Sequence, residues 1–325
     1  MRVLSLIQPT GEIHLGNYLG AIRWWAQDQH NAYSFFGLAD LHALTTEIDP
    51  AELRARSFES ASILLAAGLD PDVCTLFCQS HVPAHTELGW LMECTASYGE
   101  LGRMTQFKAK AAEHQSVSAG FFTYPALMAA DILLYDADRV PVGDDQRQHL
   151  ELARDLAQRF NHRYGVTFVV PEAAIPRVAA RVMDLQNPTA KMSKSADSPQ
   201  GTVRVLDDAA TIERKIKRAV TDTEAEVRYD RAAKPGVSNL LDLLSAATGT
   251  PPEDLAGRYT QYGPLKADTA EAVVKLLRPL QRRYETLAAD PGEVHAVLAR
   301  GAEKAAAVAE TTLKRARDAV GLLPR

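Results

Sequence analysis

The sequence predicts an α/β protein in which a domain built on a parallel sheet is followed by a smaller all-helical domain. Short apolar segments alternate with helical segments through the first half of the chain, which is the pattern of parallel strands joined by helices. A turn-rich segment follows the first apolar segment and leads into a helix, as in loops that bind phosphate. From residue 207 onward, helical segments follow one another without intervening strands.

The first three strands are predicted at residues 3–7, 33–38 and 73–78. The helix between the second and third strands has clear signals at both ends. Asp49 is its expected N-cap, Pro50 its first residue, and Gly68 follows its last apolar residue. Because helices separate these strands, the strands are expected to run parallel.

The next elements continue the same alternation. Helices are predicted at residues 86–96, 101–111, 124–135 and 146–159, with a strand at residues 139–142. The helix at 124–135 is apolar almost all round and is therefore expected to be buried on most sides. Asp131 interrupts that apolar pattern.

Pro and Ser accumulate between residues 171 and 200, which indicates a connecting loop. The helical segments beyond it are interrupted at Pro235, Pro251 and Pro291. We therefore predict a first domain at residues 1–200 and a helical domain at residues 201–325, and leave open whether the last helix packs back on the first domain.

The composition is that of an ordinary globular protein, with 46% hydrophobic and 24% charged residues. No apolar run reaches the ~18 residues needed to span a bilayer, so we expect no membrane partner and a cytoplasmic location. Cys74, Cys78 and Cys94 are too few and wrongly spaced for a structural zinc site, and no metal-binding residues are predicted. With a net charge of −5, a nucleic acid would have to be bound by local basic patches.

The segment from Gln8 to Asn17 is suited to hold phosphate. Pro9 and Gly11 mark a turn, and Gly16 lets the backbone approach a ligand closely. Asn17 is expected to cap a helix that begins near residue 18, whose free N–H groups favour an anion. The alternative interpretation is a capped turn with a surface histidine at position 14.

A second polar motif, Lys191-Met192-Ser193-Lys194-Ser195, lies in the Ser/Pro-rich connection. Two ammonium groups and two hydroxyls can close on a polyphosphate and neutralise charge on a leaving pyrophosphate. A solvated lysine pair in a linker is the alternative. The full pentapeptide is specific when it accompanies an upstream His-x-Gly-Asn loop after the first strand.

Together, His14-Leu15-Gly16-Asn17 and Lys191 to Ser195 resemble the two signatures of class I aminoacyl-tRNA synthetases. The segments Tyr124-Pro125, Met128 to Leu133 and Val140-Pro141-Val142-Gly143 are similar to those of bacterial tryptophanyl enzymes in particular. The resemblance covers nearly the whole chain. It implies a Rossmann-type parallel-sheet nucleotide-binding domain, followed by a helical tRNA- and anticodon-binding domain.

The resemblance also implies site residues, with ATP and L-tryptophan as substrates and Mg²⁺ bound mainly through the ATP phosphates. Those implied to be catalytic are His14, Lys191, Ser193, Lys194 and Ser195. Those implied to line ATP are Gln8, Pro9, Thr10, Gly16, Asn17, Gly143, Asp144, Asp145, Val182, Lys191, Met192, Ser193, Lys194 and Ser195.

The residues implied to frame tryptophan are Leu4, His42, Tyr124, Met128, Asp131, Val140, Val142 and Gln146. Asp131 would accept the indole N–H, since a buried carboxylate needs a donor and an indole N–H can only donate. Without the resemblance, a helix carboxylate paired with Arg or a backbone N–H would be favoured. Leu4 departs from related bacterial enzymes, which often place an aromatic residue there.

For tRNA(Trp), the candidate residues are Arg214, Lys215, Lys217, Arg218, Lys314 and Arg315. Basic side chains can bind phosphate, although a charge run late in a helix also complements the helix dipole and keeps a surface solvated. The resemblance further implies a homodimer, with the exposed segment Trp90-Leu91-Met92 as a candidate contact.

Two other functions stay open at this point. A tyrosine-activating relative would share the fold and both signatures, although that family tends to place Gln where this chain has Met128. A paralogue without ligase activity could act as a binding or regulatory protein. Intact signature residues disfavour this last alternative.

Overall fold

The computed structural model describes residues 1–108, 117–141, 146–174, 182–193 and 199–324. Its centre is a sheet of five parallel strands in the order β3-β2-β1-β4-β5. The strands are β1 (Arg2–Ile7), β2 (Tyr33–Leu38), β3 (Thr75–Cys78), β4 (Arg139–Pro141) and β5 (Glu172–Ala174). The predicted α/β class and the parallel sheet are confirmed. The strand order reverses between β1 and β4, which is where open α/β sheets bind their ligands.

Strand β5 lies in the segment that the sequence assigned to a connecting loop, so that assignment was wrong at its start. The strand is only three residues long and has no apolar run, because it pairs with a single neighbour at the edge of the sheet. Val140 of β4 is opposite Ala173 of β5. A short edge strand of this kind leaves no periodic signal in the sequence.

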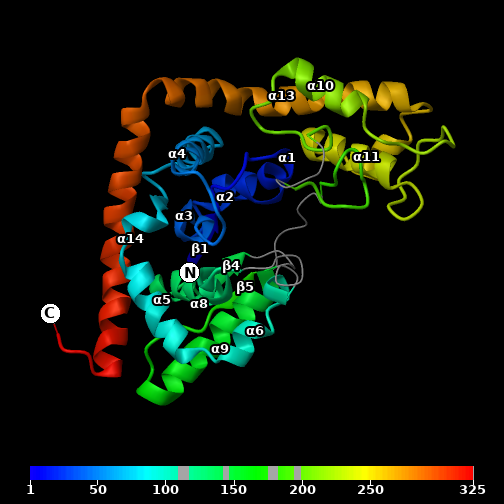
Figure 1. The fold of residues 1–325 in the computed structure, drawn as a ribbon. Helices are drawn as coiled ribbons and strands as arrows, with labels where there is room; N and C mark the ends of the chain where they lie inside the picture. Colours follow the sequence, from blue (N-terminus) through cyan, green and yellow to red (C-terminus); the bar gives the residue numbers. More distant parts are fainter. Residues whose placement is uncertain (109–116, 142–145, 175–181, 194–198, 325) are drawn as a thin grey trace.

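Helical segments connect the strands (Figure 1). They are α1 (Leu15–Asn17), η1 (Tyr18–Ile22), α2 (Arg23–Asp28), α3 (Asp40–Ala43), α4 (Pro50–Ala66), η2 (Gln79–His81), α5 (Ala84–Thr95), α6 (Tyr98–Gly102), α8 (Ala119–Leu134) and α9 (Arg147–Tyr164). The prediction for α4 is confirmed at its start, because the Asp49 carboxylate accepts from the N–H groups of Ala51 and Glu52. Part of the predicted helix 101–111 lies outside the described residues.

The second half of the chain is helical, as predicted. Its helices are α10 (Ala209–Lys217), α11 (Pro235–Thr248), α12 (Pro252–Ala256), α13 (Tyr262–Ala289) and α14 (Pro291–Val320). Of the prolines predicted to interrupt the helices, Pro235 is the first residue of α11 and Pro291 is the first residue of α14. Pro251 directly precedes α12, which begins at Pro252. A proline at this position loses no hydrogen bond, because the first helical N–H has no partner within the helix.

The last helix returns to the sheet domain, as Figure 1 shows. Helix α14 packs on the edge strand β3 and on helices α5 and α8. Gly301 lies so close to β3 that a Cβ atom there would come within 1.7 Å of the Leu76 carbonyl oxygen. At the other end of α14, Arg315 pairs with Asp136 at 2.6 Å. The helix therefore covers a sheet edge that would otherwise be open.

Two hydrophobic clusters flank the sheet. One contains the apolar residues of the first loop, helix α4 and helices α10, α11 and α13, so the helical domain shares a core with one face of the sheet. The other joins α5, α8 and α9 with the C-terminal half of α14. In the part of the chain that the structure describes, no helix combines the length and apolarity required to cross a membrane.

Candidate active site

The loop after β1 places two of the predicted side chains at the start of a helix. Gly11 has a φ of +65°, which permits the turn. His14 is the N-cap of α1, where its ring Nδ1 accepts from the Asn17 N–H at 3.3 Å while the Asn17 side chain accepts from the His14 N–H at 3.1 Å. The predicted start near residue 18 was therefore wrong, and Asn17 takes part in capping as the third helical residue rather than as the N-cap. Histidine is not a common N-cap, so the sequence pattern favoured the asparagine.

The second motif lies on a short pair of antiparallel segments. Met192 N–H donates to the Val182 carbonyl at 3.1 Å, and Asp184 N–H donates to the Ala190 carbonyl at 2.9 Å. Met183 and Lys191 form the bridge between the two segments. Lys191 is exposed and Ser193 half-buried, whereas Met192 is buried in the core. Lys194 and Ser195 lie outside the described residues.

The two motifs meet at Gly16. A Cβ atom at this position would lie 2.9 Å from the His14 ring and 3.6 Å from Cβ of Val182. Val182 in turn accepts the hydrogen bond from Met192. A side chain at this position would crowd the His14 ring, whereas its distance from Val182 would be an ordinary van der Waals contact. Gly16 thus lies beside the segment that pairs with the second motif, and its close approach to a ligand stays a prediction.

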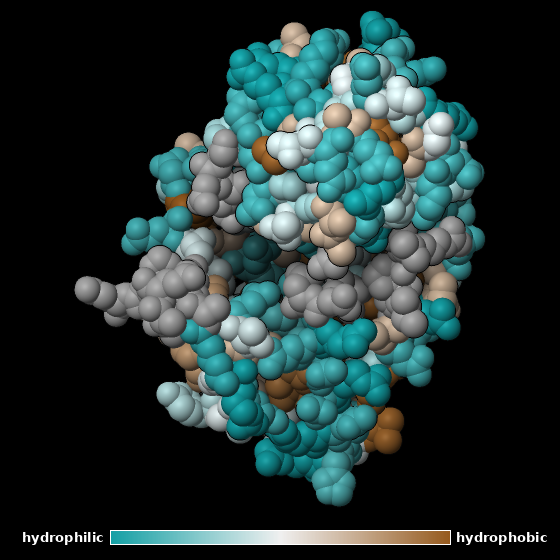
Figure 2. All heavy atoms as spheres, turned by 90° about the vertical axis from the view of Figure 1, so that its right-hand side faces the viewer, coloured by the Kyte–Doolittle hydropathy of each residue, from teal (hydrophilic) through white to brown (hydrophobic). Residues whose placement is uncertain are grey.

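The start of the helical domain is hydrogen-bonded to the first loop. Leu15 N–H donates to the Val203 carbonyl at 2.8 Å, and Val205 N–H donates to the Ile13 carbonyl at 3.0 Å. Arg204 also pairs with Glu12. The face in Figure 2 is hollowed between its upper and lower halves, and mainly hydrophilic residues surround the hollow.

Asp131 is held by three side chains inside the sheet domain. Nε2 of His42 lies 2.7 Å from its Oδ2 atom, while Nε2 of Gln79 and Nδ1 of His85 lie 2.7 and 2.6 Å from Oδ1. Asp131 itself is only 2% exposed. Because an ionised carboxylate can only accept, all three neighbours donate to it, and Nε2 of His85 lies 2.8 Å from the Tyr135 hydroxyl.

The charge state of Asp131 follows from these contacts. Burial alone raises the pKa of a carboxyl group, but the charge and hydrogen bond of His42, together with the hydrogen bond of His85, outweigh it and lower the pKa of Asp131 to about 2. The site therefore contains a buried, ionised acceptor at neutral pH. An ionised carboxylate has about four acceptor positions, and side chains among the described residues use three of them.

Tyr124 contacts His42, one of the partners of Asp131. Its ring meets the His42 ring edge-on, with centroids 6.1 Å apart. Its hydroxyl donates to Gln106 Oε1 at 2.8 Å and lies 2.6 Å from Nε2 of the buried His149. Burial raises the pKa of Tyr124 to about 12, so the phenol stays protonated.

The apolar residues predicted for the same pocket are close to one another. Leu4 and Val140 belong to one buried cluster, and Met128 packs against that cluster one turn before Asp131 on α8. Gln146 caps α9 at the far side of β4. Val142, Gly143, Asp144 and Asp145 lie outside the described residues.

Several residues around the site had not been predicted from the sequence. They are Gln79, His85, Tyr135, Gln106 and His149. Gln79 directly follows the carboxyl end of β3, as His42 follows β2, so the rule for open α/β sheets could have found it. Nothing in the local sequence distinguishes the two histidines from ordinary helix residues.

The candidate tRNA-binding residues are placed differently from one another. Arg214, Lys217 and Arg218 are exposed at the end of α10. Lys215 is only 5% exposed, and its ammonium group binds the Thr202 carbonyl at 2.8 Å and Asp207 at 2.6 Å. The prediction that Lys215 faces a tRNA phosphate is therefore wrong, because this lysine lies on the apolar side of the helix with Ile212 and Ile216.

On α14, Lys314 is exposed and pairs with Asp318 at 2.8 Å. Arg315 pairs with Asp136 of the sheet domain and also contacts Thr312. Of these two cations, Lys314 has the more open side chain.

A family model for class I tRNA synthetases (W and Y) matches residues 1–278. The chain belongs to this family. The synthetase is 55% identical over 327 residues to tryptophan–tRNA ligase 1 of Streptomyces avermitilis, and the match covers 99% of both chains. The resemblance inferred from the two signatures is confirmed.

Solved structures agree with this assignment. Tryptophanyl-tRNA synthetase from Mycoplasma pneumoniae is 39% identical to the synthetase with a TM-score of 0.92, covering 99% of this chain and 98% of that one. The enzyme from Campylobacter jejuni, solved with ADP and tryptophan, is 34% identical with a TM-score of 0.86, covering 99% and 100%. The Rossmann-type sheet domain and the helical domain predicted from the sequence are confirmed.

Proposed function

We propose that this synthetase is a tryptophan–tRNA ligase. It would activate L-tryptophan with ATP to tryptophanyl-adenylate and pyrophosphate, then transfer tryptophan to the 3′ end of tRNA(Trp). The observation that carries the proposal is Asp131, a buried and ionised acceptor with one position left for a donor. An indole N–H is a donor of this kind.

In this proposal the pocket selects tryptophan by a hydrogen bond and by shape. A site built around one substrate donor can reject an analogue that lacks it by about 10⁴–10⁵, so phenylalanine would be excluded without editing. Tyrosine can also donate, and must be excluded by the shape of the apolar walls. Leu4, Met128 and Val140 support such walls, because they share one cluster beside Asp131.

The two signature loops would bind ATP and act on its phosphates. The tryptophan carboxylate attacks the α-phosphorus, the bond to the β-phosphate oxygen breaks, and pyrophosphate leaves with the electron pair. His14 and Lys191, together with Lys194, would stabilise the charge that develops on the phosphates. No covalent enzyme intermediate is needed, since catalysis consists of positioning and electrostatic stabilisation.

Mg²⁺ would accompany ATP and share the charge of its phosphates. The described side chains at the first loop supply imidazole and amide groups at His14 and Asn17, while Lys191 supplies an ammonium group. These groups suit phosphate oxygens better than a hard cation, which prefers oxygen ligands. We therefore propose that the ion is held mainly through ATP.

The assembly and the cellular location are also proposals. Trp90 on α5 is 64% exposed and Tyr98 on α6 is 83% exposed, which is unusual for large aromatic residues and favours a homodimer contact there. Met92 is buried in the core and does not take part in such a contact. A cytoplasmic location follows from the proposed tRNA substrate.

Amino-acid-dependent exchange of pyrophosphate into ATP tests the proposal against its two rivals. We expect exchange with tryptophan alone among the twenty amino acids. Exchange with tyrosine would instead identify a tyrosine-activating relative. Absence of exchange with any amino acid would identify a non-catalytic paralogue.

A further inference from the structure

Asn239 joins the helical domain to the second signature loop. It is the fifth residue of α11, which starts at Pro235, and is 2% exposed. Its side chain makes two hydrogen bonds to one residue: Oδ1 accepts from the Met183 N–H at 2.9 Å, and Nδ2 donates to the Met183 carbonyl at 3.0 Å. The amide therefore pairs with the backbone as a neighbouring strand would.

Met183 lies on the segment that pairs with the second signature motif. Met183 forms the bridge to Lys191, and its two neighbours, Val182 and Asp184, bond to residues 190 and 192. Backbone groups alternate along an extended segment, so those of Met183 point to the opposite edge, where the Asn239 side chain bonds to both of them. Asn239 thus fixes the outer edge of the 182–184 segment, which pairs on its other edge with the segment that carries Lys191 and Ser193.

The other end of this segment is tied to the same helix. Leu185 accepts from the Val220 N–H at 2.8 Å, and the Val220 carbonyl in turn lies against Gly236, where a Cβ atom would come within 2.1 Å of it. The contact leaves no room for a side chain between α11 and the 220–221 backbone. The segment is therefore held by α11 directly through Asn239 and indirectly through Gly236.

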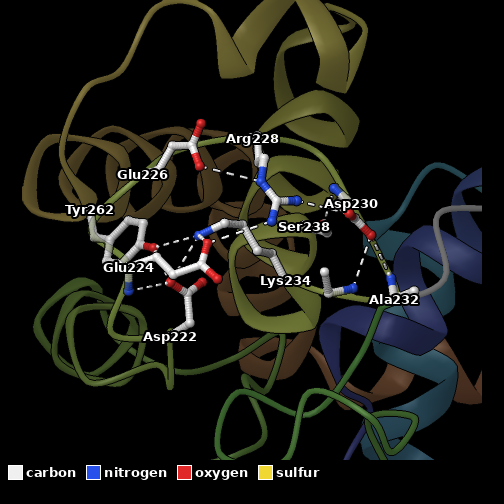
Figure 3. A network of polar contacts seen from close by, with 10 residues as sticks. Asp222, Glu224, Glu226, Arg228, Asp230, Ala232, Lys234, Ser238 and Tyr262 are labelled. Carbon is white, nitrogen blue, oxygen red and sulfur yellow. Dashed lines mark hydrogen bonds and ion pairs between the residues drawn. The ribbon is translucent and has the colours of Figure 1, made fainter.

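The N-terminus of α11 is itself anchored by an ion cluster around a buried lysine (Figure 3). Lys234 is fully buried, and its ammonium group lies 2.9 Å from both Asp222 and Glu224 and 3.1 Å from the Tyr262 hydroxyl. Tyr262 is the first residue of α13. The cluster therefore joins the 220–234 segment, α11 and α13 into one support beneath Asn239.

We propose that Asn239 is a positioning residue for adenylate formation, which acts from the helical domain by holding Lys191 and Ser193 in place for the ATP phosphates. The inference rests on the proposed function, because it takes that function's role for Lys191 as given. Only a side chain with an acceptor and a donor at this spacing can serve both groups of Met183. Alanine provides neither, and aspartate provides the acceptor alone.

The experiment compares Asn239→Ala and Asn239→Asp with Asn161→Ala. Asn161 makes the same kind of contact elsewhere, bonding the backbone of Thr167 and Phe168 at the end of α9. Each variant is assayed by tryptophan-dependent ATP–pyrophosphate exchange, tryptophan binding at equilibrium and thermal unfolding. Aspartate keeps the shape and the acceptor of asparagine, so it reports even if the alanine variant does not fold.

We expect both Asn239 variants to lose about 10- to 100-fold in kcat/KM for ATP, because small displacements of positioning groups have effects of this size. Their tryptophan affinity should stay within about twofold of the wild type, and Asn161→Ala should keep wild-type ATP kinetics. Wild-type ATP kinetics in Asn239→Asp, or equal losses in Asn161→Ala, would overturn the inference. Failure of the wild type to exchange with tryptophan would instead overturn the proposed function.

Discussion

At the scale of single residues, the account depends on how an acidic side chain is stabilised inside an apolar helix. Asp131 would be costly to bury without partners, and His42, Gln79 and His85 each supply a donor. The sequence interpretation without a family had favoured Arg or a backbone N–H as the partner. The observed partners are two histidines and a glutamine from three separate elements, and their three hydrogen bonds use three of the carboxylate's acceptor positions.

Asp131→Asn tests this role. The amide keeps the size of the side chain but turns one acceptor into a donor, which then faces donors. Hydrogen bonds to charged groups contribute about 1.5–3 kcal/mol, so we expect kcat/KM for tryptophan to fall by roughly 10- to 150-fold with little change in KM for ATP.

The control is Asp136→Asn, the same substitution at a carboxylate that pairs with Arg2 and Arg315 outside the pocket. It should keep wild-type tryptophan kinetics. Equal tryptophan kinetics in the two variants would contradict the role assigned to Asp131.

At the scale of elements, α14 is positioned by a close contact with the sheet. Gly301→Ala would place a Cβ atom 1.7 Å from the Leu76 carbonyl, a backbone atom that cannot rotate away. Overpacking of this kind typically costs about 1–3 kcal/mol. We expect the free energy of unfolding, measured in urea, to fall by an amount near the upper end of that range.

The matched control is Gly263→Ala near the start of α13, where a Cβ atom would meet nothing within 4 Å. This variant should be neutral or slightly more stable, because alanine favours helices. If both variants had the same stability, α14 would not pack on β3 as described.

Helices α6 and α9 are joined by an ion pair that makes stability depend on pH. The hydrogen bond from Arg159 lowers the pKa of Glu100 to about 2, with one contact of 2.9 Å between Nη1 and Oε2. A lowered pKa stabilises the fold above the unfolded value of about 4.3, and this stabilisation is lost as the pH falls toward 2.

Glu100→Gln should therefore reduce stability by about 1 kcal/mol at pH 7, a modest value because Arg159 is partly exposed. The difference from the wild type should disappear between about pH 4.3 and pH 2 in urea titrations. Glu303→Gln, at an exposed position of α14, serves as the control and should show no such trend. A difference that stayed constant with pH would contradict the account of the pair.

The elements also show what sequence could and could not predict. Helix α4 was predicted with its N-cap because Asp49 and Pro50 act locally. Strand β5 was not predicted, because its pairing with β4 depends on residues distant in the chain. The N-cap at His14 was not predicted, because histidine is an uncommon N-cap. The same limit applies to His85 and His149, whose partners lie on other helices.

At the scale of the whole molecule, the helical domain is hydrogen-bonded directly to the segments proposed to bind ATP. The first loop bonds to residues 203 and 205, and α11 holds Met183, which pairs with Lys191 of the second signature. The family resemblance gave the two signatures their roles, but only the structure brings Gly16 against Val182. A displacement of the helical domain would therefore be transmitted to Lys191 through Met183, which bonds to Asn239 and pairs with Lys191.

The proposed dimer can be tested on the exposed aromatic surface. Trp90→Glu places a charge at a position that is 64% exposed in the single chain and would be buried between two copies. We expect this variant to sediment as a monomer and the wild type as a dimer. Leu323→Glu, near the end of the chain, should sediment as the wild type does, and an unchanged dimer of Trp90→Glu would exclude this surface.

The most direct test of the central claim is the acylation of tRNA(Trp) with labelled tryptophan. We predict that the wild-type synthetase charges tRNA(Trp) with tryptophan in an ATP-dependent reaction. It should not charge tRNA(Tyr) with tyrosine. Charging of tRNA(Tyr) with tyrosine, or no charging of tRNA(Trp) by an enzyme that is folded and binds ATP, would contradict the account.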